Sequence, residues 1–343
     1  MNQVNQKIID AIIAKAERVC PDSLLLIGLY GSAATGDVHP KSDLDLLILV
    51  GDDKGRRLAD GFILEDAGIG YDIYCTGWEM LEGDARCDHA HLSRLLDCKV
   101  VYVKDPAALT RLKALQDKAR ALLASDQRKE NARAAMAMAK AVYADAFLAE
   151  SLSKVRTCAG AAIHYLLDAL MLHHGQYFRL GVKRTFEELS PLSLPLDLEA
   201  MVLSVIRGET AEDIRTGLTA LMRCVRDHLN DPMPKEQPSE ANLKGTYEEM
   251  FSNWRNKMGE ATQRGDLYSS FMNLVSFQFM LGEIAAGVDI PDLDAMAKFD
   301  PLDLLKNAEA FDAILAQYRE EYRKIGLEPK VLPNADAFLT QYE

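Results

Sequence analysis

Two aspartates separated by a single residue, Asp43 and Asp45, are the side chains in this chain best suited to chemistry. They stand at the start of an apolar run, Leu44–Val50, which has the length of a buried strand. Side chains at positions i and i+2 of a strand point to the same face, so the two carboxylates converge. Two like charges this close repel each other unless a cation neutralises them. The pair therefore predicts a site for a hard divalent cation, which we expect to be Mg²⁺.

Small residues that suit phosphate binding precede the aspartates. An earlier apolar run, Leu24–Tyr30, ends at Gly31 and Ser32, and Gly36 follows shortly after. Glycine lets the backbone turn tightly and come close to a ligand. The small residues that follow suit the start of a helix, where free N–H groups face an anion. We therefore expect a phosphate-binding turn beside the cation site.

A third carboxylate lies in the next strand-forming segment. Residues Ile69–Cys75 read IGYDIYC, and Asp72 interrupts their apolar character. An aspartate within a strand is unfavourable unless it faces solvent or a site. If this strand pairs beside the strand that follows Asp45, Asp72 completes a triad with the first two aspartates.

The wording of these segments resembles a known family. They read LYGSAATG and SDLDLLIL, with Pro40 between them. A Gly-Ser turn at the end of a strand, followed by Asp-x-Asp on the next strand, resembles the nucleotidyltransferase superfamily, which includes DNA polymerase β and the aminoglycoside nucleotidyltransferases. The sequence of these motifs is especially similar to that of the aminoglycoside enzymes, over roughly the first hundred residues. Ala33 departs from the pattern, because many relatives carry a larger, often basic residue there.

The resemblance implies a reaction and a set of residue roles. Asp43, Asp45 and Asp72 would bind two Mg²⁺ ions that bridge a nucleoside triphosphate, and Asp72 would take the proton from the acceptor hydroxyl. A nucleoside monophosphate, which we expect to be AMP from ATP, would pass to a small hydroxylated, aminoglycoside-like acceptor as pyrophosphate leaves. The residues expected to bind the triphosphate are Gly31, Ser32, Gly36 and Ser42.

Two alternative functions are compatible with the same motifs. The acceptor could be a protein or an RNA end, as in antitoxin-like nucleotidyltransferases. The domain could also be a non-catalytic nucleotide-binding module. The intact carboxylates count against the module, since a sensor could tolerate their loss.

The composition argues against a partner with a long phosphate backbone. The chain has 343 residues and a formal net charge of −13, and it contains no block rich in lysine and arginine. Proteins that grip long nucleic acids usually present a basic face, so none is expected here. The acidic excess lies mainly in the C-terminal part. It suits a cationic acceptor, although ordinary solubility explains it equally well.

The chain is predicted to be an α+β protein. A nucleotidyltransferase domain with a mixed sheet and flanking helices is expected over residues 1–125. Almost everything afterwards has helical periodicity. A helical bundle is expected over 126–230, to close the cleft and choose the acceptor, and a second helical subdomain over 239–343. The best linker candidate is Asn230–Pro238, a polar run with three prolines.

Some residues of the helical region are weaker candidates. Tyr177, Phe178 and Arg179 could line an acceptor or nucleobase pocket, although packing and surface charge explain them equally well. Arg223 and His228 match the short Arg-x₄-His signature of HEPN helical domains. Positions i and i+5 lie well apart around a helix, so a structural role is favoured for this pair.

The cysteines and the apolar runs indicate in which cellular compartment the protein is expected. Six cysteines are scattered without a Cys-x-x-Cys pair, which is typical of thiols in a reducing environment. The N-terminal residues lack the uninterrupted apolar core of a signal peptide, and no continuous apolar run reaches the length of a membrane span. A cytoplasmic protein without a membrane partner is expected, and the oligomeric state is left open.

Overall fold

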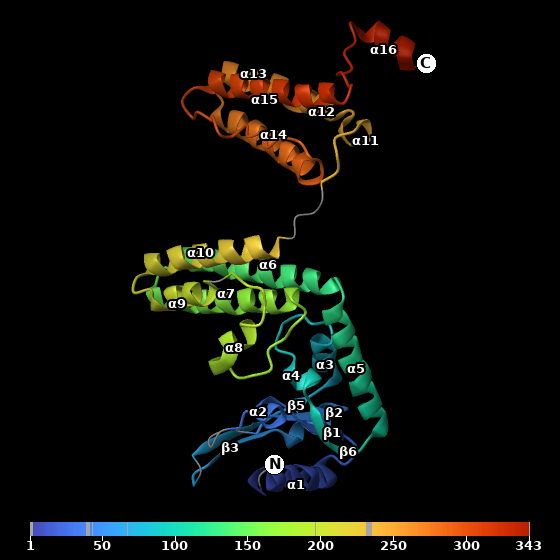
Figure 1. The fold of residues 1–343 in the computed structure, drawn as a ribbon, viewed down its shortest axis with the longest axis vertical. Coiled ribbons are helices and arrows are strands. Elements are labelled where there is room, and N and C mark those ends of the chain that lie inside the picture. Colours follow the sequence, from blue (N-terminus) through green and yellow to red (C-terminus); the bar gives the residue numbers. More distant parts are fainter. Residues whose placement is uncertain are drawn as a thin grey trace. The chain divides into compact units, whose positions relative to one another are not determined.

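The computed structural model describes residues 3–38, 42, 44–66, 68–195, 197–230 and 235–342. The chain forms two compact units, residues 1–231 and residues 232–343. Both are drawn in Figure 1. The division falls within the proline-containing segment Asn230–Pro238 that the sequence indicated as a linker.

A four-stranded mixed sheet forms the centre of the N-terminal part. Its strands are β1 (Leu24–Leu29), β2 (Leu46–Val50), β5 (Cys75–Thr76) and β6 (Lys99–Val103), in the order β5-β2-β1-β6. β1 pairs antiparallel with both β2 and β6, and β2 pairs parallel with β5. The predicted mixed sheet with flanking helices is therefore confirmed.

The central strand β2 is buried on both faces, which explains its continuous apolar sequence. Leu46, Ile48 and Val50 pack into a core with helix α1 (Gln3–Val19). Leu47 and Leu49 alternate with them and pack into a second core on the opposite face. Figure 1 shows α1 on one side of the sheet and α3 and α4 on the other.

A hairpin beside this sheet corrects one expectation. The segment Ile69–Cys75 was expected to complete the aspartate triad if it paired beside the strand that follows Asp45, and most of this segment does not pair there. β4 (Ile69–Ile73) instead pairs antiparallel with β3 (Asp60–Leu64), where no strand was predicted, and the short β5 alone reaches β2. Stacking of Phe62 on Tyr71 and burial of Tyr71 and Ile73 hold the hairpin against the α1 core.

The remaining elements of the N-terminal unit are helical. A 3₁₀ turn, η1 (Asp53–Leu58), precedes the hairpin, and a second, η2 (Val182–Arg184), precedes α8. The helices not yet given are α2 (Gly31–Thr35), α3 (Trp78–Asp84), α4 (Ser93–Leu96), α5 (Pro106–Ala124), α6 (Gln127–Leu148), α7 (Leu152–His173), α8 (Thr185–Leu189), α9 (Leu198–Arg207) and α10 (Ala211–Leu229).

One hydrophobic core connects the sheet to the helical bundle. It contains Leu26 of β1, Leu112 of α5, Leu166 of α7 and Leu221 of α10, so it is continuous across residue 125. The boundary predicted between residues 125 and 126 therefore remains a prediction. α7 is as long and apolar as a membrane-spanning helix, but much of it is buried within the unit, as the central helix of a folded bundle is.

The C-terminal unit is helical, as expected, and has its own core. Phe277, Phe311, Tyr318 and Tyr322 are buried together there. Its elements are α11 (Glu240–Leu243), α12 (Thr246–Met250), the π-helical turn η3 (Phe251–Arg255), α13 (Asn256–Arg264), α14 (Leu267–Gly287), α15 (Leu304–Lys324) and α16 (Ala335–Tyr342).

Candidate functional site

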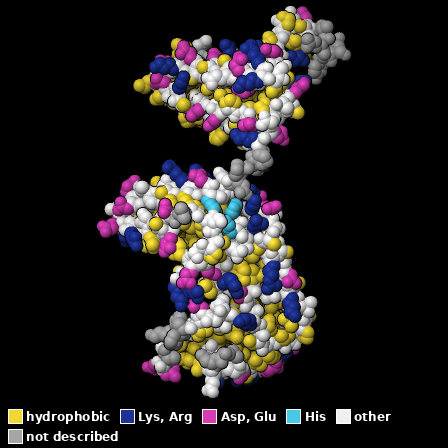
Figure 2. All heavy atoms as spheres, viewed as in Figure 1, with side chains coloured by type: hydrophobic (Ala, Val, Ile, Leu, Met, Phe, Trp, Pro, Cys, Tyr) yellow, Lys and Arg dark blue, Asp and Glu magenta, His cyan; other side chains and the backbone are white. Residues whose placement is uncertain are grey.

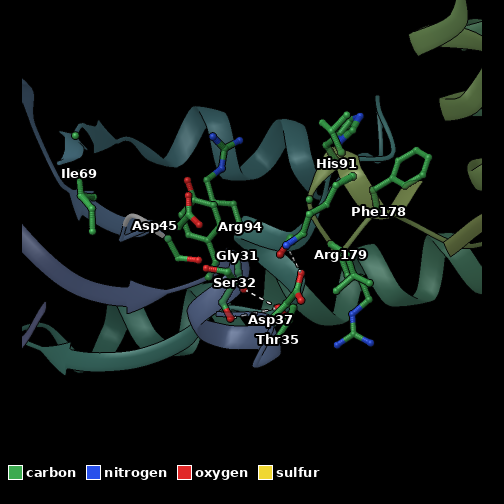
Figure 3. A pocket seen from close by; sticks show the side chains of 18 of the residues that line it. Gly31, Ser32, Thr35, Asp37, Asp45, Ile69, His91, Arg94, Phe178 and Arg179 are labelled. Carbon is green, nitrogen blue, oxygen red and sulfur yellow. Dashed lines mark hydrogen bonds and ion pairs between the residues drawn. The ribbon is translucent and has the colours of Figure 1, made fainter. Parts of the chain in front are cut away.

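A cavity of about 1010 Å³ lies beside the carboxyl end of β1. It is lined by residues from three stretches of the chain, within 30–45, 68–94 and 178–183. Figure 3 shows Asp45, Ser32 and Gly31 close together on one wall, with Phe178 and His91 across from them. The predicted glycine turn and one predicted carboxylate therefore meet at a cavity.

Gly31 and Asp45 are packed directly against each other. β1 and β2 stay paired to their ends, where the Tyr30 N–H donates to the Asp45 carbonyl at 3.2 Å. The chain then turns at Gly31, whose φ is +60°, and a Cβ atom at Gly31 would overlap the Asp45 carboxylate. Glycine is needed here for both its backbone conformation and its lack of a side chain.

The turn continues through the short helix α2. The Thr35 hydroxyl donates to the Gly31 carbonyl at 3.1 Å, and the Gly36 N–H donates to the Ser32 carbonyl at 3.0 Å. Gly36 has a φ of +82° and ends the helix. Of the residues predicted to bind phosphate, Gly31, Ser32 and Ser42 line the cavity, whereas Gly36 is a turn residue outside the set that lines it.

The other two predicted carboxylates are placed differently. Asp43 lies outside the described residues. Asp72 is exposed on β4, opposite Gly61 in the hairpin, and is not among the described residues that line the cavity. Alternation along the strand puts it on the same face as Gly70, which does line the cavity. A catalytic role for Asp43 and Asp72 therefore stays a prediction.

Tyr74, which follows the hairpin, contributes to a polar network beside Asp45. Its hydroxyl lies 2.9 Å from the hydroxyl of Tyr30. Burial, the hydrogen bond to Tyr74 and the negative charge of Asp45 raise the pKa of Tyr30 well above its ordinary value. Tyr30 therefore remains a neutral phenol that can donate a hydrogen bond in the site.

Arg94 adds a fixed positive charge to the cavity wall. Its guanidinium binds both oxygens of the buried Asp84 carboxylate, at 2.8 and 2.9 Å, and lies 3.5 Å from the Tyr74 hydroxyl. Burial opposes the charged form of Arg94, but Asp84 outweighs it and raises the arginine's pKa. The Asp84 hydrogen bond likewise raises the pKa of His89. Nothing in the local sequence singles out Arg94, because its partners come from other elements.

The helical region supplies the opposite wall of the cavity. Asp97 accepts hydrogen bonds from the Tyr177 hydroxyl at 3.0 Å and from the Arg179 Nε at 3.1 Å. Burial, together with this carboxylate, raises the pKa of Tyr177 to about 12. Phe178 donates its N–H to the Ala90 carbonyl at 2.8 Å. Phe178 and Arg179 therefore line the cavity, while Tyr177 anchors the segment beside it.

A second set of contacts fixes the remainder of this wall, residues 178–183. Glu188 accepts the backbone N–H groups of Arg179 and Leu180, at 2.8 and 3.1 Å. Arg184 pairs with Asp37, just after α2, at 3.1 Å. The cavity is lined by the basic side chains of Arg94, Arg179 and Lys183, and Asp45 lies on the opposite wall from residues 178–183. This combination of positive charge and a carboxylate suits a polyphosphate with bound cations.

The Arg223/His228 signature lies away from this cavity. Both residues are on α10, and the His228 Nε2 lies 3.0 Å from the Nε2 of His174. Neither is among the described residues that line the cavity. The relation to HEPN domains therefore stays a prediction.

Charged side chains of both signs are mixed on the surface. On the face shown in Figure 2, the lysine and arginine side chains of the described residues are interspersed with aspartate and glutamate rather than gathered in one basic patch.

Comparison with known proteins identifies the N-terminal part. Residues 14–90 match a family described as nucleotidyltransferase domain. A comparison with curated proteins found no match. The matched residues contain the Gly-Ser turn, Asp45 and the hairpin. Residues 14–90 of this chain therefore match a nucleotidyltransferase domain, which supports the predicted superfamily and a transferase of phosphorus-containing groups.

Proposed function

We propose that the protein transfers AMP from ATP to a hydroxyl group of a small molecule in the cytoplasm, releasing pyrophosphate. The observation that carries this proposal is the Asp45 carboxylate held against the Gly31 turn, in a cavity that the helical region completes. Nucleotidyl transfer is the chemistry of the family, and the donor, acceptor and metal are our inference.

The residues of the cavity fit a magnesium-bound triphosphate. Asp45 supplies hard carboxylate oxygens, and its tight packing on Gly31 leaves its carboxylate little freedom to turn away. We propose that Asp43 and Asp72 complete the set of ligands. When bound, Mg²⁺ would neutralise the triphosphate and the charge that develops as the bond to the α-phosphorus breaks.

The protein's own groups would orient and activate the two substrates. Ser32 and the backbone at Gly31 hold the β- and γ-phosphates, and Arg94 adds positive charge nearby. Asp72 accepts the proton of the attacking hydroxyl as general base. The hydroxyl then attacks the α-phosphorus in line, and pyrophosphate departs.

The acceptor would bind against the wall formed by the helical region. Phe178, which stacks on His91, lines this wall, and Asp37, which pairs with Arg184, also lines the cavity. We propose a small, hydroxylated, aminoglycoside-like molecule as the acceptor, because the motifs around Gly31 and Asp45 resemble those of the aminoglycoside nucleotidyltransferases.

The direct test is a transfer assay with labelled ATP, Mg²⁺ and a panel of aminoglycosides. A mass gain of one AMP on an acceptor, with pyrophosphate release, supports the proposal. Transfer of the label to a protein or to an RNA end would favour the antitoxin-like alternative over a small-molecule acceptor. Nucleotide binding without turnover on every acceptor would favour the non-catalytic module.

We expect Asp45→Asn to lower turnover by at least about a hundredfold with little change in thermal stability, because a charge that stabilises the transition state is lost. Asp53→Asn is the matched control, since Asp53 is exposed on η1 and pairs with Arg56 only locally. Equal rates for the two variants would remove Asp45 from the mechanism. Chelation of Mg²⁺ with EDTA should abolish turnover, and added Mg²⁺ should restore it.

A further inference from the structure

Three side chains that nucleotidyl transfer does not use meet at a second position. His91 lies in the loop between α3 and α4, and His164 and Asp168 lie one turn apart on α7. One ligand atom of each lies within 4.8 Å of those of the others. The His91 Nε2 is 3.3 Å from Asp168 Oδ1, and the His164 Nε2 is 3.8 Å from Asp168 Oδ2.

Asp168 is the unusual member of this cluster. Its exposed fraction is 1%, yet its Oδ1 has no hydrogen-bond partner among the described residues. The contact with His91 is close enough for a hydrogen bond but lacks the necessary alignment. A buried carboxylate oxygen without a donor is costly, and a cation placed between it and the two imidazoles would remove that cost.

We propose that His91, His164 and Asp168 bind a divalent transition-metal ion of the zinc class. Two imidazole nitrogens and one carboxylate oxygen form a common donor set for Zn²⁺, which differs from the all-oxygen set that Mg²⁺ prefers. Ligands about 2.0–2.1 Å from a tetrahedral zinc ion stand about 3.3 Å apart, which matches the separation between His91 and Asp168. Water would complete the coordination from the adjoining cavity of about 430 Å³.

The metal would join the nucleotidyltransferase domain to the helical bundle. His91 follows α3, whereas His164 and Asp168 belong to α7. The His91 ring stacks on His164 at 4.9 Å and on Phe178 at 5.1 Å. His91 and Phe178 both line the large cavity (Figure 3), so the ion would hold the wall against which the acceptor is proposed to bind. The metal site itself does not depend on that acceptor.

The test measures Zn²⁺ binding to the full-length protein, stripped with EDTA and held without nucleotide, by equilibrium dialysis. We expect a stoichiometric ion whose affinity falls at least about tenfold in His164→Ala and in Asp168→Asn. The His164 side chain is half exposed, so its removal should leave the fold intact, as checked by circular dichroism.

His228→Ala is the matched control. His228 and His174 form a separate histidine pair in the same unit, which could also take up zinc. The His228→Ala variant must still bind the Zn²⁺ ion that the His164→Ala variant no longer binds. Failure of the wild-type protein to bind Zn²⁺, or loss of the ion in His228→Ala with retention in His164→Ala, would overturn the proposal. Co²⁺ in place of Zn²⁺ should give a visible spectrum without a thiolate charge-transfer band, and such a band would assign the ion to cysteine instead.

Discussion

Gly31 sets both the backbone conformation of the turn and the position of the Asp45 carboxylate. We expect Gly31→Ala to lower the catalytic efficiency of transfer by about a hundredfold, because a Cβ atom there would displace the Asp45 carboxylate. The positive φ adds a cost of about 1–2 kcal/mol in the free energy of unfolding. Kinetics and thermal unfolding measure the two effects separately.

Gly265→Ala is the control for backbone strain. Gly265 also has a positive φ, +64°, but no atom lies within 4 Å of the position its Cβ would take. This variant should lose similar stability and keep its activity. If both variants lose activity equally, strain rather than displacement of Asp45 would be the cause.

Among the elements, the segment of residues 178–183 is held by a carboxylate on α8. Glu188→Ala removes the acceptor of two backbone N–H groups, those of Arg179 and Leu180. A hydrogen bond to a charged group contributes about 1.5–3 kcal/mol, so amide exchange at these two positions should accelerate by about tenfold or more. Amide hydrogen exchange, monitored by NMR, measures the exchange rate at each of these two residues.

Glu187→Ala tests the specificity of that effect. Glu187 neighbours Glu188 but pairs with the Arg184 side chain and accepts no backbone N–H from Arg179 or Leu180. Exchange at these two amides should therefore stay at the wild-type rate. Equal acceleration in both variants would mean that α8 as a whole, rather than the Glu188 carboxylate, holds the segment.

Helix α10 begins with a capping box that makes its stability depend on pH. Asp213 accepts hydrogen bonds from the Thr210 side chain and from its backbone N–H, and these bonds lower the pKa of Asp213 below its ordinary 3.8. A carboxylate with a lowered folded pKa stabilises the protein above its unfolded pKa, and this contribution is lost as pH falls through the folded value.

Asp213→Ala should therefore lower the free energy of unfolding at neutral pH, and the difference from wild type should shrink as the pH falls below about 3.8. Denaturant titrations over this pH range measure it. Glu212→Ala is the control, because Glu212 lies in the same first turn but outside the capping box. If the difference in the free energy of unfolding between Asp213→Ala and wild type stays constant with pH, the stabilising role assigned to the Asp213 carboxylate would be contradicted.

The whole chain consists of two units with separate cores, and this predicts separate unfolding. Phe277 is fully buried in the C-terminal unit. Phe277→Ala should destabilise that unit by about 3–5 kcal/mol and leave amide protection in the N-terminal unit unchanged. Leu218→Ala, at a fully buried position of α10, should have the converse effect. Loss of protection in both units from either variant would show that they unfold together.

Local sequence patterns were enough to predict that the Gly31 turn and Asp45 lie together. The strands around Gly31 and Asp45 are short apolar runs, and their turn and spacing are set within about twenty residues, where local rules are strong. The mixed sheet and the helical C-terminal region followed from the same periodicities. The match of residues 14–90 agrees with this local information.

The remaining features depend on contacts between residues distant in the chain. The wall around Phe178 is anchored by Asp97, and His91 meets Asp168 of a helix much later in the chain. The hairpin was missed for another reason: its strands are close in the chain, but they pair with each other instead of extending the main sheet. Such pairings are decided by which buried surfaces fit together when the chain packs, and no periodicity in the sequence encodes that choice.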